Sequence, residues 1–493
     1  MIPLSLAEIA AILGGRLAGG ANPDAIASAP VEFDSRRIVP GGLFLAFAGA
    51  HVDGHDFVPA ALAAGAVAAI VTRPCGLPSI EVDDPLAAIA ALAGYVVRRL
   101  PDVVVVGVTG SSGKTSTKDL LADLLSRLGP TIAPLGSFNN ELGYPHTVLQ
   151  ADENTRFLVL ETSARGVGHI RFLTGIAPPR IGAVLNVGSA HLGEFGSREA
   201  IAQAKGELVE ALPPAAEGGV AILNADDPFV RDMGSRASAR VVTVGLDPRA
   251  QVAAADVQID ALGRAGFRIV TAAASVPVTL RLSGEHHVGN ALAAAAVALE
   301  CGLPLADAAD GLSAATARSR WRMELIERAD GVLIVNDSYN ANPESMRAAL
   351  KTLAGIGRGG GRRRTWAVLG PMGELGEQSR AEHDALGRLA VRLDISRVVA
   401  VGEQARAIAQ GAALEGSWNG ESSWVADIEA AARLLRAELR AGDAVLVKAS
   451  RSASLERLVA LLADDAKVAD RTDGPDEAHR QADRPADRQG EQL

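Results

Sequence analysis

The stretch VVVVGVTGSSGKTSTKDLLADLL, residues 103–125, constrains the fold more than any other part of the chain. Its four consecutive valines, 103–106, are typical of a strand that is buried on both faces of a parallel sheet. After a glycine-rich turn, residues 115–125 have helical spacing, with four leucines on one side. A buried strand followed by a tight turn and a helix predicts an α/β sheet in which the helix N-terminus binds an anion.

The turn itself reads TGSSGKT and predicts a phosphate cradle. Backbone N–H groups at the helix start point toward the anion, Lys114 reaches the β- and γ-phosphates, and the Thr115 hydroxyl holds Mg²⁺. The expected nucleotide-binding residues are Gly110, Ser111, Ser112, Gly113, Lys114, Thr115 and Ser116. The spacing departs from the usual Walker form, because two residues instead of four separate Gly110 from the Gly-Lys-Thr sequence at 113–115. An ordinary glycine–serine turn is the alternative, but it does not require Gly-Lys-Thr directly behind four valines.

Composition limits the class of protein. A chain of 493 residues predicts about three domains, and abundant glycine, scarce aromatics (3%) and alanine-rich helices alternating with Val/Ile strands favour α/β architecture. The net charge of −10 argues against a nucleic-acid partner. Cys75 and Cys301 lie far apart without metal-ligand spacing, so we expect two small buried side chains in a reducing compartment.

The N-terminus and the apolar runs predict a protein that does not enter a membrane. Residues 5–8, Ser-Leu-Ala-Glu, form a capping box rather than the basic start of a secretory signal. The longest apolar stretches are shorter than the ~18–20 residues that span a bilayer. We therefore expect a soluble, cytoplasmic chain.

The strand-like runs fall into three groups. They lie at 43–48, 66–71 and 79–82; then at 103–106, 157–160, 181–187, 220–223 and 241–244; and finally at 332–335, 366–369, 398–401 and 444–447. The middle group predicts a doubly wound, mainly parallel sheet, followed by antiparallel β structure at about 251–282. The predicted domains are 1–100, 101–318 and 319–466. The remainder, 467–493, is too polar to fold and is predicted to be disordered.

Several polar residues stand at the ends of predicted strands, where α/β sheets bind ligands. Glu161 ends the strand FLVLE and is placed to present an acid to Mg²⁺; His191 follows the next strand, although a histidine there is more often structural. Lys205 lies on a helix, where a solvated lysine is the usual interpretation. The loop NDSYNANP, 336–343, has more polar side chains than a turn needs. The turns Asp-Ser-Arg at 34–36 and Asp-Gly-His at 53–55 are equally compatible with ligand binding and with solvated turns.

Ordered motifs along nearly the whole chain resemble those of the Mur ligases of peptidoglycan synthesis. They are DSRRIVPGGLF and DGHDF, then TGSSGKT, FNNELGYP, AHLGEFGS, AKGEL and LNADD, and finally RWRME, NDSYNANPESM, LGPMGELGEQS and VLVKASRS. The resemblance implies a three-domain architecture, with a central P-loop ATPase domain flanked by two smaller α/β domains. It further implies a monomeric ATP-dependent amide ligase that adds D-alanyl-D-alanine to UDP-N-acetylmuramoyl-tripeptide through an acyl phosphate.

The resemblance also implies roles for individual residues. Thr115, Glu161, His191 and Lys205 would serve the metal sites, with two Mg²⁺ ions, and Lys205 would be carried as a carbamate. Lys114, Lys205, His191 and Asp337 would be the catalytic groups. Asn290 would face the adenine, and Arg322 and Asp337 would complete the nucleotide site. Ser35, Arg36, Asp53 and His55 would lie near the uridine diphosphate, Asn139 and Asn140 near the muramoyl peptide, and Tyr339, Asn340 and Asn342 near the dipeptide or the closed domain interface.

Three positions depart from the family pattern. His287 stands where many relatives have asparagine, so no role is assigned to it; the pair at 162–163 is Thr-Ser instead of a Gly-containing pair, and Ala449 replaces a glycine. Two other functions are alternatives: a related amide ligase, such as a folylpolyglutamate-type enzyme, and a non-catalytic ATP-binding protein. The DSR and DGH motifs of the first domain argue against the folylpolyglutamate type. The presence of Lys114, Glu161, His191, Lys205 and Asp337 together argues against a non-catalytic protein. The sequence leaves open whether the third residue of the tripeptide is diaminopimelate or lysine.

Overall fold

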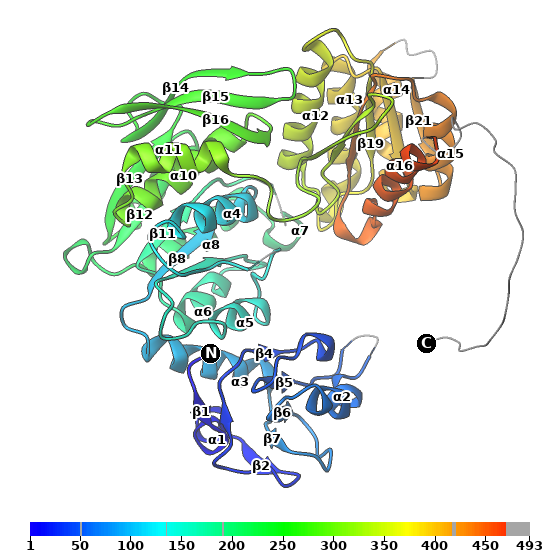
Figure 1. The fold of residues 1–493 in the computed structure, drawn as a ribbon. Coiled ribbons are helices and arrows are strands. Elements are labelled where there is room, and N and C mark those ends of the chain that lie inside the picture. Colours follow the sequence, from blue (N-terminus) through cyan, green and yellow to red (C-terminus); the bar gives the residue numbers. More distant parts are fainter. Residues whose placement is uncertain (50–51, 135, 190–191, 417–420, 470–493) are drawn as a thin grey trace, which may run out of the picture.

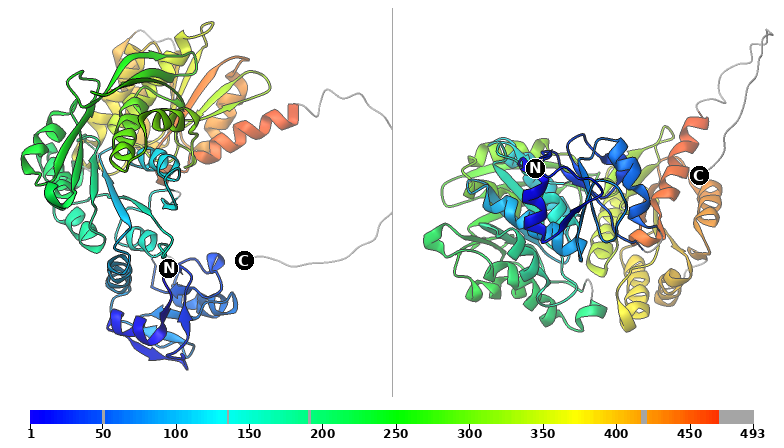
Figure 2. Two further views of the ribbon diagram at one scale, coloured as in Figure 1. Left: turned by 60° about the vertical axis from the view of Figure 1, so that its left-hand side comes forward. Right: turned by 90° about the horizontal axis from the view of Figure 1, so that it is seen from below.

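The computed structural model describes residues 1–49, 52–134, 136–189, 192–416 and 421–469. Within these residues the strands form a five-stranded, a nine-stranded and a six-stranded sheet in chain order, together with one short two-stranded pair. Each larger sheet carries its own helices, so the fold is mixed α/β, as predicted. Figures 1 and 2 show the N-terminal unit (blue) at one end of the central unit (cyan to green) and the C-terminal unit (yellow to red) at another.

The nine-stranded sheet is organised around the phosphate-loop strand. Its order is β16-β15-β14-β13-β12-β11-β8-β10-β9, and the strands from β9 to β14 pair in parallel, whereas β14, β15 and β16 pair antiparallel. Both features are confirmed. The strands are β8 (Val104–Thr109), β9 (Thr131–Ile132), β10 (Phe157–Glu161), β11 (Ile181–Val184), β12 (Val220–Asn224), β13 (Arg240–Gly245), β14 (Val252–Ile259), β15 (Arg264–Val270) and β16 (Ser275–Ser283).

Helices cover both faces of this sheet. They are α4 (Lys114–Leu125), α5 (Gly143–Val148), α6 (His169–Ile176), α7 (Leu192–Phe195), α8 (Arg198–Glu210), α9 (Pro228–Asp232), α10 (His287–Glu300) and α11 (Leu305–Ala314), with short 3-10 turns η3 (Ala215–Glu217) and η4 (Met233–Arg236). The leucines of α4 pack with the alanine-rich α10 and with β8 in one hydrophobic core. In the parallel register Glu161 lies opposite Val108 and Val184 opposite Thr109, so the loops after β8, β10 and β11 leave the same edge.

The N-terminal unit is built on the sheet β2-β7-β6-β5-β4, in which β2 is antiparallel. Its strands are β1 (Leu4–Ser5), β2 (Arg16–Ala18), β3 (Ile26–Ala27), β4 (Val31–Glu32), β5 (Leu43–Leu45), β6 (Ala68–Val71) and β7 (Ser79–Glu81). Its helices are α1 (Leu6–Leu13), η1 (Ser35–Arg37), η2 (Gly54–Phe57), α2 (Val58–Ala63) and α3 (Pro85–Arg98). The capping box predicted at the start of α1 is confirmed, because Ser5 and Glu8 bond each other reciprocally.

The C-terminal unit has the sheet order β17-β18-β22-β19-β20-β21, in which β17 alone is antiparallel to its neighbour. The strands are β17 (Glu324–Glu327), β18 (Leu333–Asn336), β19 (Thr365–Leu369), β20 (Arg397–Val401), β21 (Ser422–Val425) and β22 (Ala444–Lys448). The helices are α12 (Pro343–Arg358), η5 (Gly376–Gln378), α13 (Ser379–Arg392), η6 (Glu403–Ala405), α14 (Arg406–Glu415), α15 (Ile428–Glu438), η7 (Arg451–Ala453) and α16 (Glu456–Ala469). The first three residues of the predicted disordered tail therefore belong to α16, and residues 470–493 lie outside the described part.

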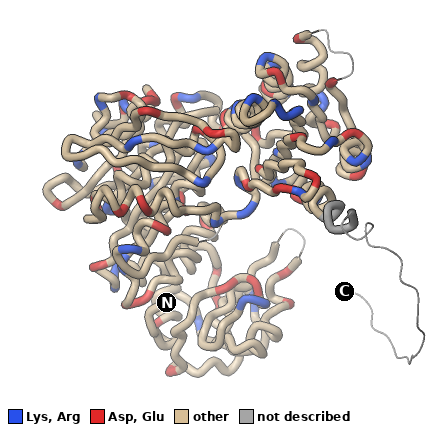
Figure 3. The backbone as a smooth tube through the Cα atoms, turned by 45° about the horizontal axis from the view of Figure 1, so that its top comes forward, with Lys and Arg blue, Asp and Glu red and all other residues tan. Residues whose placement is uncertain are grey.

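Charged side chains are spread over the whole chain. Lys and Arg positions are interspersed with Asp and Glu along all three units in Figure 3. None of the described helices is long and apolar enough to cross a lipid bilayer. Cys75 and Cys301 are free thiols that are only partly buried, so the expectation of two buried cysteines is wrong in degree. Their side chains stand at the margins of the cores, where Cys301 contacts the central core only from outside.

Candidate functional site

The phosphate loop joins β8 to α4 at the centre of the nine-stranded sheet. Gly113 has φ +82°, and a Cβ there would lie 2.4 Å from Asn290 Oδ1, so the loop rests directly on α10. Lys114 Nζ donates a hydrogen bond to the Gly110 carbonyl at 2.7 Å. Burial lowers the pKa of Lys114, Glu161 opposes this shift, and Arg322 adds to it. A half-buried lysine beside a helix N-terminus is suited to bind an anionic phosphate.

Oxygen and amide groups converge beside the loop. Thr115 Oγ1 donates to Glu161 Oε2 at 2.8 Å, and Asn139 Nδ2 donates to Glu161 Oε1 at 2.7 Å. A hydroxyl and a carboxylate at the edge of a phosphate site fit Mg²⁺, which takes few protein oxygens and completes its octahedron with phosphates and water. The described residues contain no group of three or more His, Cys, Asp and Glu arranged to hold a metal ion.

A cavity of about 530 Å³ joins the phosphate loop to the C-terminal unit. The residues predicted from the sequence that line it are Ser111, Ser112, Gly113, Lys114, Thr115, Ser116, Asn139, Asn140, Glu161, Arg322, Asp337, Tyr339, Asn340 and Asn342. Gly110, Lys205, Asn290, Ser35, Arg36, Asp53 and His55 do not line it. His191, predicted as a metal ligand, lies outside the described residues. The structure thus brings together groups that are more than 200 positions apart in the chain.

Lys205 is buried in α8, contrary to the usual expectation for a helical lysine. Burial, followed by the charge of Lys114, lowers its pKa well below the ordinary value. Among the described residues no hydrogen-bond or ion-pair partner of its amine is found, and no carboxylate compensates its charge. The buried amine is therefore stabilised in the neutral form, which is the nucleophilic form of a lysine.

Arg322 links the C-terminal unit to the edge of the sheet beside the phosphate loop. Its Nη2 donates to Ser137 Oγ at 2.9 Å, and Ser137 lies 2.9 Å from Thr115 Oγ1. Its guanidinium stacks 4.3 Å from the centre of the Tyr339 ring. The neighbouring residues Trp321 and Met323 adopt φ +63° and +52°. Left-handed backbone at bulky residues is unfavourable and concentrates at functional sites, so the chain is strained where it aims this arginine.

Asp337 forms a buried ion pair with a residue that was not assigned from the sequence. Lys448 Nζ lies 2.5 Å from Asp337 Oδ2 and donates to the Asn340 carbonyl at 2.9 Å, while the backbone N–H of Met323 donates to Asp337 Oδ1. Lys448 ends β22, the strand next to β18, and thereby fixes the loop that carries Asp337, Tyr339 and Asn340.

Replacing Lys448 with methionine is expected to destabilise the C-terminal unit by about 3 kcal/mol, because the Asp337 carboxylate would stay buried without its cation. Differential scanning calorimetry of the full chain would measure the loss as a lowered transition temperature. Arg406→Ala is the control, since Arg406 forms an exposed pair with Glu403 and such pairs contribute little. An equal, small change in both variants would contradict the prediction.

The predicted residues of the N-terminal unit form two local clusters. Arg36 pairs with Asp34, and this pairing lowers the pKa of Asp34 to about 2. His55 Nδ1 lies 2.6 Å from Asp53 Oδ1, and its Nε2 accepts from the backbone N–H of Thr72 at 3.1 Å. The backbone N–H of His55, followed by the side chains of His55 and Arg73, holds the pKa of Asp53 below its usual range. These contacts stabilise the turns themselves, and their role toward a ligand remains a prediction.

Sequence reasoning missed a histidine pair at the cavity. His286 and His287 line the cavity with ring centres 4.3 Å apart, and Asn290 Nδ2 lies 3.3 Å from His287 Nδ1. Burial lowers the pKa of His287 well below its usual value and favours its neutral ring, whereas His286 is exposed. Their position at the start of the alanine-rich helix was the available signal, but the periodicity of that helix does not indicate which of its ends meets the phosphate loop.

Comparisons with known proteins place every part of this site within one family. The description "Mur ligase family, catalytic domain" matches residues 30–103, "Mur ligase middle domain" matches 108–298, and "Mur ligase, glutamate ligase domain" matches 321–451. The UDP-N-acetylmuramoyl-tripeptide–D-alanyl-D-alanine ligase of Mycobacterium bovis is 50% identical over 94% of this chain and 99% of its own length. The Escherichia coli protein of the same name is 36% identical, with the same coverage of both chains.

Solved structures agree in fold. A crystal structure of MurF from Acinetobacter baumannii superposes with a TM-score of 0.82 at 33% identity and covers 94% of this chain and 99% of its own. MurF of Thermotoga maritima in complex with ADP superposes with a TM-score of 0.76 at 29% identity and covers 90% and 98%. The matched regions include the phosphate loop, Glu161, Lys205, Arg322, Asp337 and Lys448. The chain belongs to the Mur ligase family.

Proposed function

We propose that the chain is an ATP-dependent amide ligase that adds D-alanyl-D-alanine to UDP-N-acetylmuramoyl-tripeptide. The observation that carries the ligase chemistry is the single cavity in which Lys114, Glu161 and Asn139 of the central unit meet Arg322 and Asp337 of the C-terminal unit. The identity of the substrates is supported by relatives of that name that match this chain over nearly its full length.

The reaction has two steps. The tripeptide carboxylate attacks the γ-phosphorus of ATP, and the bond to the β–γ bridging oxygen breaks, which gives an acyl phosphate and ADP. The dipeptide amine then attacks the acyl carbon, loses a proton, and expels phosphate through a tetrahedral intermediate. Lys114 offsets the repulsion between carboxylate and γ-phosphate, and such electrostatic stabilisation is usually the largest catalytic contribution.

The C-terminal unit has a mechanical purpose in this reaction. An acyl phosphate hydrolyses if water reaches it, so the unit that carries Arg322 and Asp337 must cover it before the amine arrives. Holding amine and acyl phosphate in contact is worth an effective concentration of ~10⁵–10⁸ M. We infer that docking of this unit on the phosphate loop provides both effects.

Magnesium fits the oxygen donors of Thr115 and Glu161, and two ions are expected by resemblance to the family. When bound, Mg²⁺ neutralises phosphate charge and polarises the phosphorus toward attack. The chain's own contribution is to hold Glu161 between Thr115 and Asn139, so that the carboxylate is oriented before the ion binds.

Lys205 is proposed to carry a carbamate. Its neutral amine would attack CO₂, form an N–C bond and release one proton, which converts the side chain into an anion with two oxygen donors. A buried cation close to Lys114 is unfavourable, whereas a carbamate would be attracted to Lys114 and to a metal ion. The depressed pKa supports this modification because a protonated amine does not react with CO₂.

The remaining assignments follow the same division of the chain. We propose domains at 1–100, 101–318 and 319–466. Asn290, Arg322 and Asp337 would contact the nucleotide; Ser35, Arg36, Asp53 and His55 the uridine diphosphate; Asn139 and Asn140 the muramoyl peptide; and Tyr339, Asn340 and Asn342 the dipeptide. The chain is proposed to act as a monomer in the cytoplasm, where ATP and UDP-linked precursors are found, with His191 as a further metal ligand.

The function is tested by phosphate release from ATP in the presence of UDP-N-acetylmuramoyl-tripeptide, with and without D-alanyl-D-alanine. Release that depends on the dipeptide, with the amide product identified by mass spectrometry, is the expected result. Release independent of the dipeptide, or none at all, would favour another amide ligase or a non-catalytic nucleotide-binding protein. Tripeptides with diaminopimelate or lysine at position three would define the preferred substrate.

A further inference from the structure

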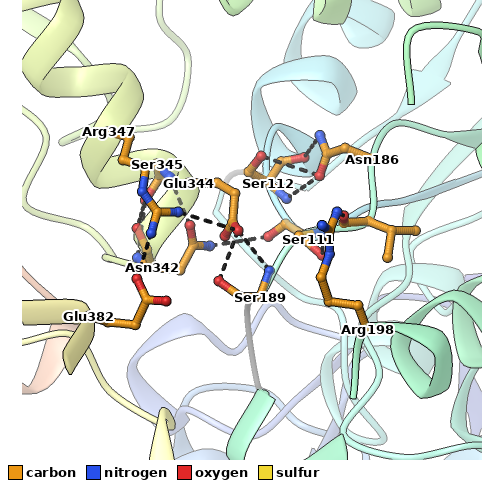
Figure 4. A network of polar contacts seen from close by, with 12 residues as sticks. Ser111, Ser112, Asn186, Ser189, Arg198, Asn342, Glu344, Ser345, Arg347 and Glu382 are labelled. Atoms are coloured by element: carbon orange, nitrogen blue, oxygen red, sulfur yellow. Dashed lines mark hydrogen bonds and ion pairs between the residues drawn. The ribbon is translucent and has the colours of Figure 1, made fainter. Parts of the chain in front are cut away.

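The start of α12 in the C-terminal unit is docked on the loop that follows β11 in the central unit (Figure 4). Glu344 Oε1 accepts two hydrogen bonds from one residue, from the Ser189 backbone N–H at 2.8 Å and from Ser189 Oγ at 2.9 Å. The donors and the acceptor are 155 positions apart, so this contact joins two separate units rather than stabilising one element.

The docked loop is itself bonded to the phosphate loop. The backbone N–H of Ser111 donates to the Asn186 carbonyl at 3.1 Å, and that of Ser112 donates to Asn186 Oδ1 at 2.9 Å. In return, the backbone N–H of Gly188 donates to Ser111 Oγ at 2.8 Å. Because β8 and β11 are parallel neighbours, their following loops lie side by side, and any shift of 186–189 is transmitted to Ser111 and Ser112.

A second bond closes the network. Asn342 Nδ2 donates to the Ser111 carbonyl at 3.2 Å, while the side chain of Asn342 also caps α12 by accepting from the Ser345 backbone N–H at 2.9 Å. The first turn of α12 therefore contacts the phosphate loop directly through Asn342 and indirectly through Glu344 and Ser189. Figure 4 shows the three segments meeting around the Glu344 carboxylate.

Glycines allow this close approach. A Cβ on Gly188 would lie 2.5 Å from Glu344 Cδ. Further along the same connection, the Gly193 backbone N–H donates to the Glu374 carbonyl at 3.3 Å, and a Cβ on Gly193 would lie 2.7 Å from the Gly376 nitrogen. Two glycines of the central unit thus lie where side chains would separate it from the C-terminal unit.

The carboxylate of Glu344 is held at the boundary of two cavities. It lines both the main cavity and a second one of about 400 Å³ that also contains Asn186, Arg198, Arg347 and Glu382. Arg347 pairs with Glu382 at 2.6 Å and lies 3.9 Å from Glu344 Oε1, so its charge faces the carboxylate without taking over the bonds to Ser189. The carboxylate of Glu344 therefore makes its hydrogen bonds to Ser189, and its contact with Arg347 of its own helix is the longer one.

We propose that Glu344 is a positioning residue that couples the geometry of the phosphate loop to docking of the C-terminal unit. This rests on the proposed ligase function for its catalytic consequence, although the coupling itself does not. When Glu344 holds Ser189, the loop 186–189 is fixed against Ser111 and Ser112, and Arg322 and Asp337 stand at the nucleotide. Loss of the contact removes one of the bonds that hold the C-terminal unit against the phosphate-loop edge of the cavity, while the bond of Asn342 to Ser111 remains. Misplacement of reacting groups by about 1 Å costs about 10²-fold in rate.

The test compares Glu344→Ala and Glu344→Gln with Glu403→Ala, an exposed glutamate of the same unit, as the matched control. We expect kcat to fall at least about tenfold in Glu344→Ala and less in Glu344→Gln, whose amide oxygen still accepts both bonds. The affinity for ADP, measured by calorimetry, should change less than twofold, because the central unit holds the phosphates. Gly188→Ala should reproduce the Glu344→Ala phenotype from the opposite side of the contact.

Two further measurements distinguish a positioning role of Glu344 from a purely structural one. They also allow this proposal to fail independently of the proposed ligase function. Glu344→Ala and Ser189→Ala should be non-additive in log kcat, since the hydroxyl bond that Ser189→Ala removes is one of the two bonds that Glu344→Ala removes. Hydrogen–deuterium exchange of segments 181–189 and 343–350 should be faster in Glu344→Ala than in Glu403→Ala, whether or not ligation is observed. Unchanged kcat and exchange in Glu344→Ala, or additive effects of the two alanines, would overturn the proposal. A wild-type chain without ligase activity but with the exchange difference would overturn the proposed function alone.

Discussion

Replacing Lys114 with alanine is expected to lower ligase turnover by about 10³-fold, because it removes the cation that faces the transferring phosphate. The amine lies at the start of α4, within 2.7 Å of the Gly110 carbonyl, and exchanges that bond for the phosphates when ATP binds. Burial lowers the pKa of Lys114. A negatively charged phosphate bound beside the amine would favour its protonated, cationic form. Dipeptide-dependent phosphate release at saturating ATP measures the effect.

Lys351→Ala is the matched control for this variant, since Lys351 is an exposed lysine in α12, away from the cavity. It should retain full turnover. Full turnover in Lys114→Ala as well would contradict the prediction that this loop binds the phosphates of ATP. The melting temperature of both variants should be compared, so that loss of folding is not mistaken for loss of catalysis.

Replacing Lys205 with alanine is expected to lower kcat by about 10²–10³-fold, which corresponds to the several kcal/mol that a metal-binding charge contributes to a phosphoryl transition state. Lys205→Glu should retain more activity than Lys205→Ala, because a carboxylate supplies the negative charge that a carbamate would carry. Intact-protein mass spectrometry of the wild type in bicarbonate buffer should show one added CO₂, and Lys205→Ala should not.

The wild-type enzyme should also respond to CO₂ and to pH. Removal of CO₂ should reduce its activity, and bicarbonate should restore it. As the pH falls through the depressed pKa of Lys205, the amine becomes protonated and carbamate formation ceases, so the activity is lost on the acidic side. Equal activity of Lys205→Ala and wild type at every CO₂ concentration would contradict the hypothesis that Lys205 carries a carbamate.

Several parts of the site could be read from the sequence because their signals are local. Four valines, a glycine-rich turn and a helical run identify β8, the phosphate loop and α4. Glu161 stands at the carboxyl edge of the sheet, as its strand-end position predicted, since the parallel neighbours β8 and β10 end together; its role toward a metal ion stays a prediction. The dense polar run after β18 also proved to line the cavity.

Other residues could not be assigned in this way. Helical spacing places Lys205 on α8 but does not reveal that α8 packs its lysine inward, close to Lys114. Asn290 was expected to face the adenine; in the structure it lies against Gly113, and its contact with the adenine stays a prediction. Glu344 and Lys448 appear in the sequence as an ordinary helical glutamate and a strand-end lysine.

The sequence by itself determined the order of strands and helices, the α/β class and the phosphate loop, because burial and backbone geometry leave periodic patterns over a few residues. The tertiary structure decided which separate segments meet. It packs α3 of the N-terminal unit with Tyr144 and Val148 of α5 in a hydrophobic core that also includes β10. It also brings Glu344 to Ser189 and Asp337 to Lys448. Such contacts depend on the packing of whole sheets and helices, a long-range property that no local period records.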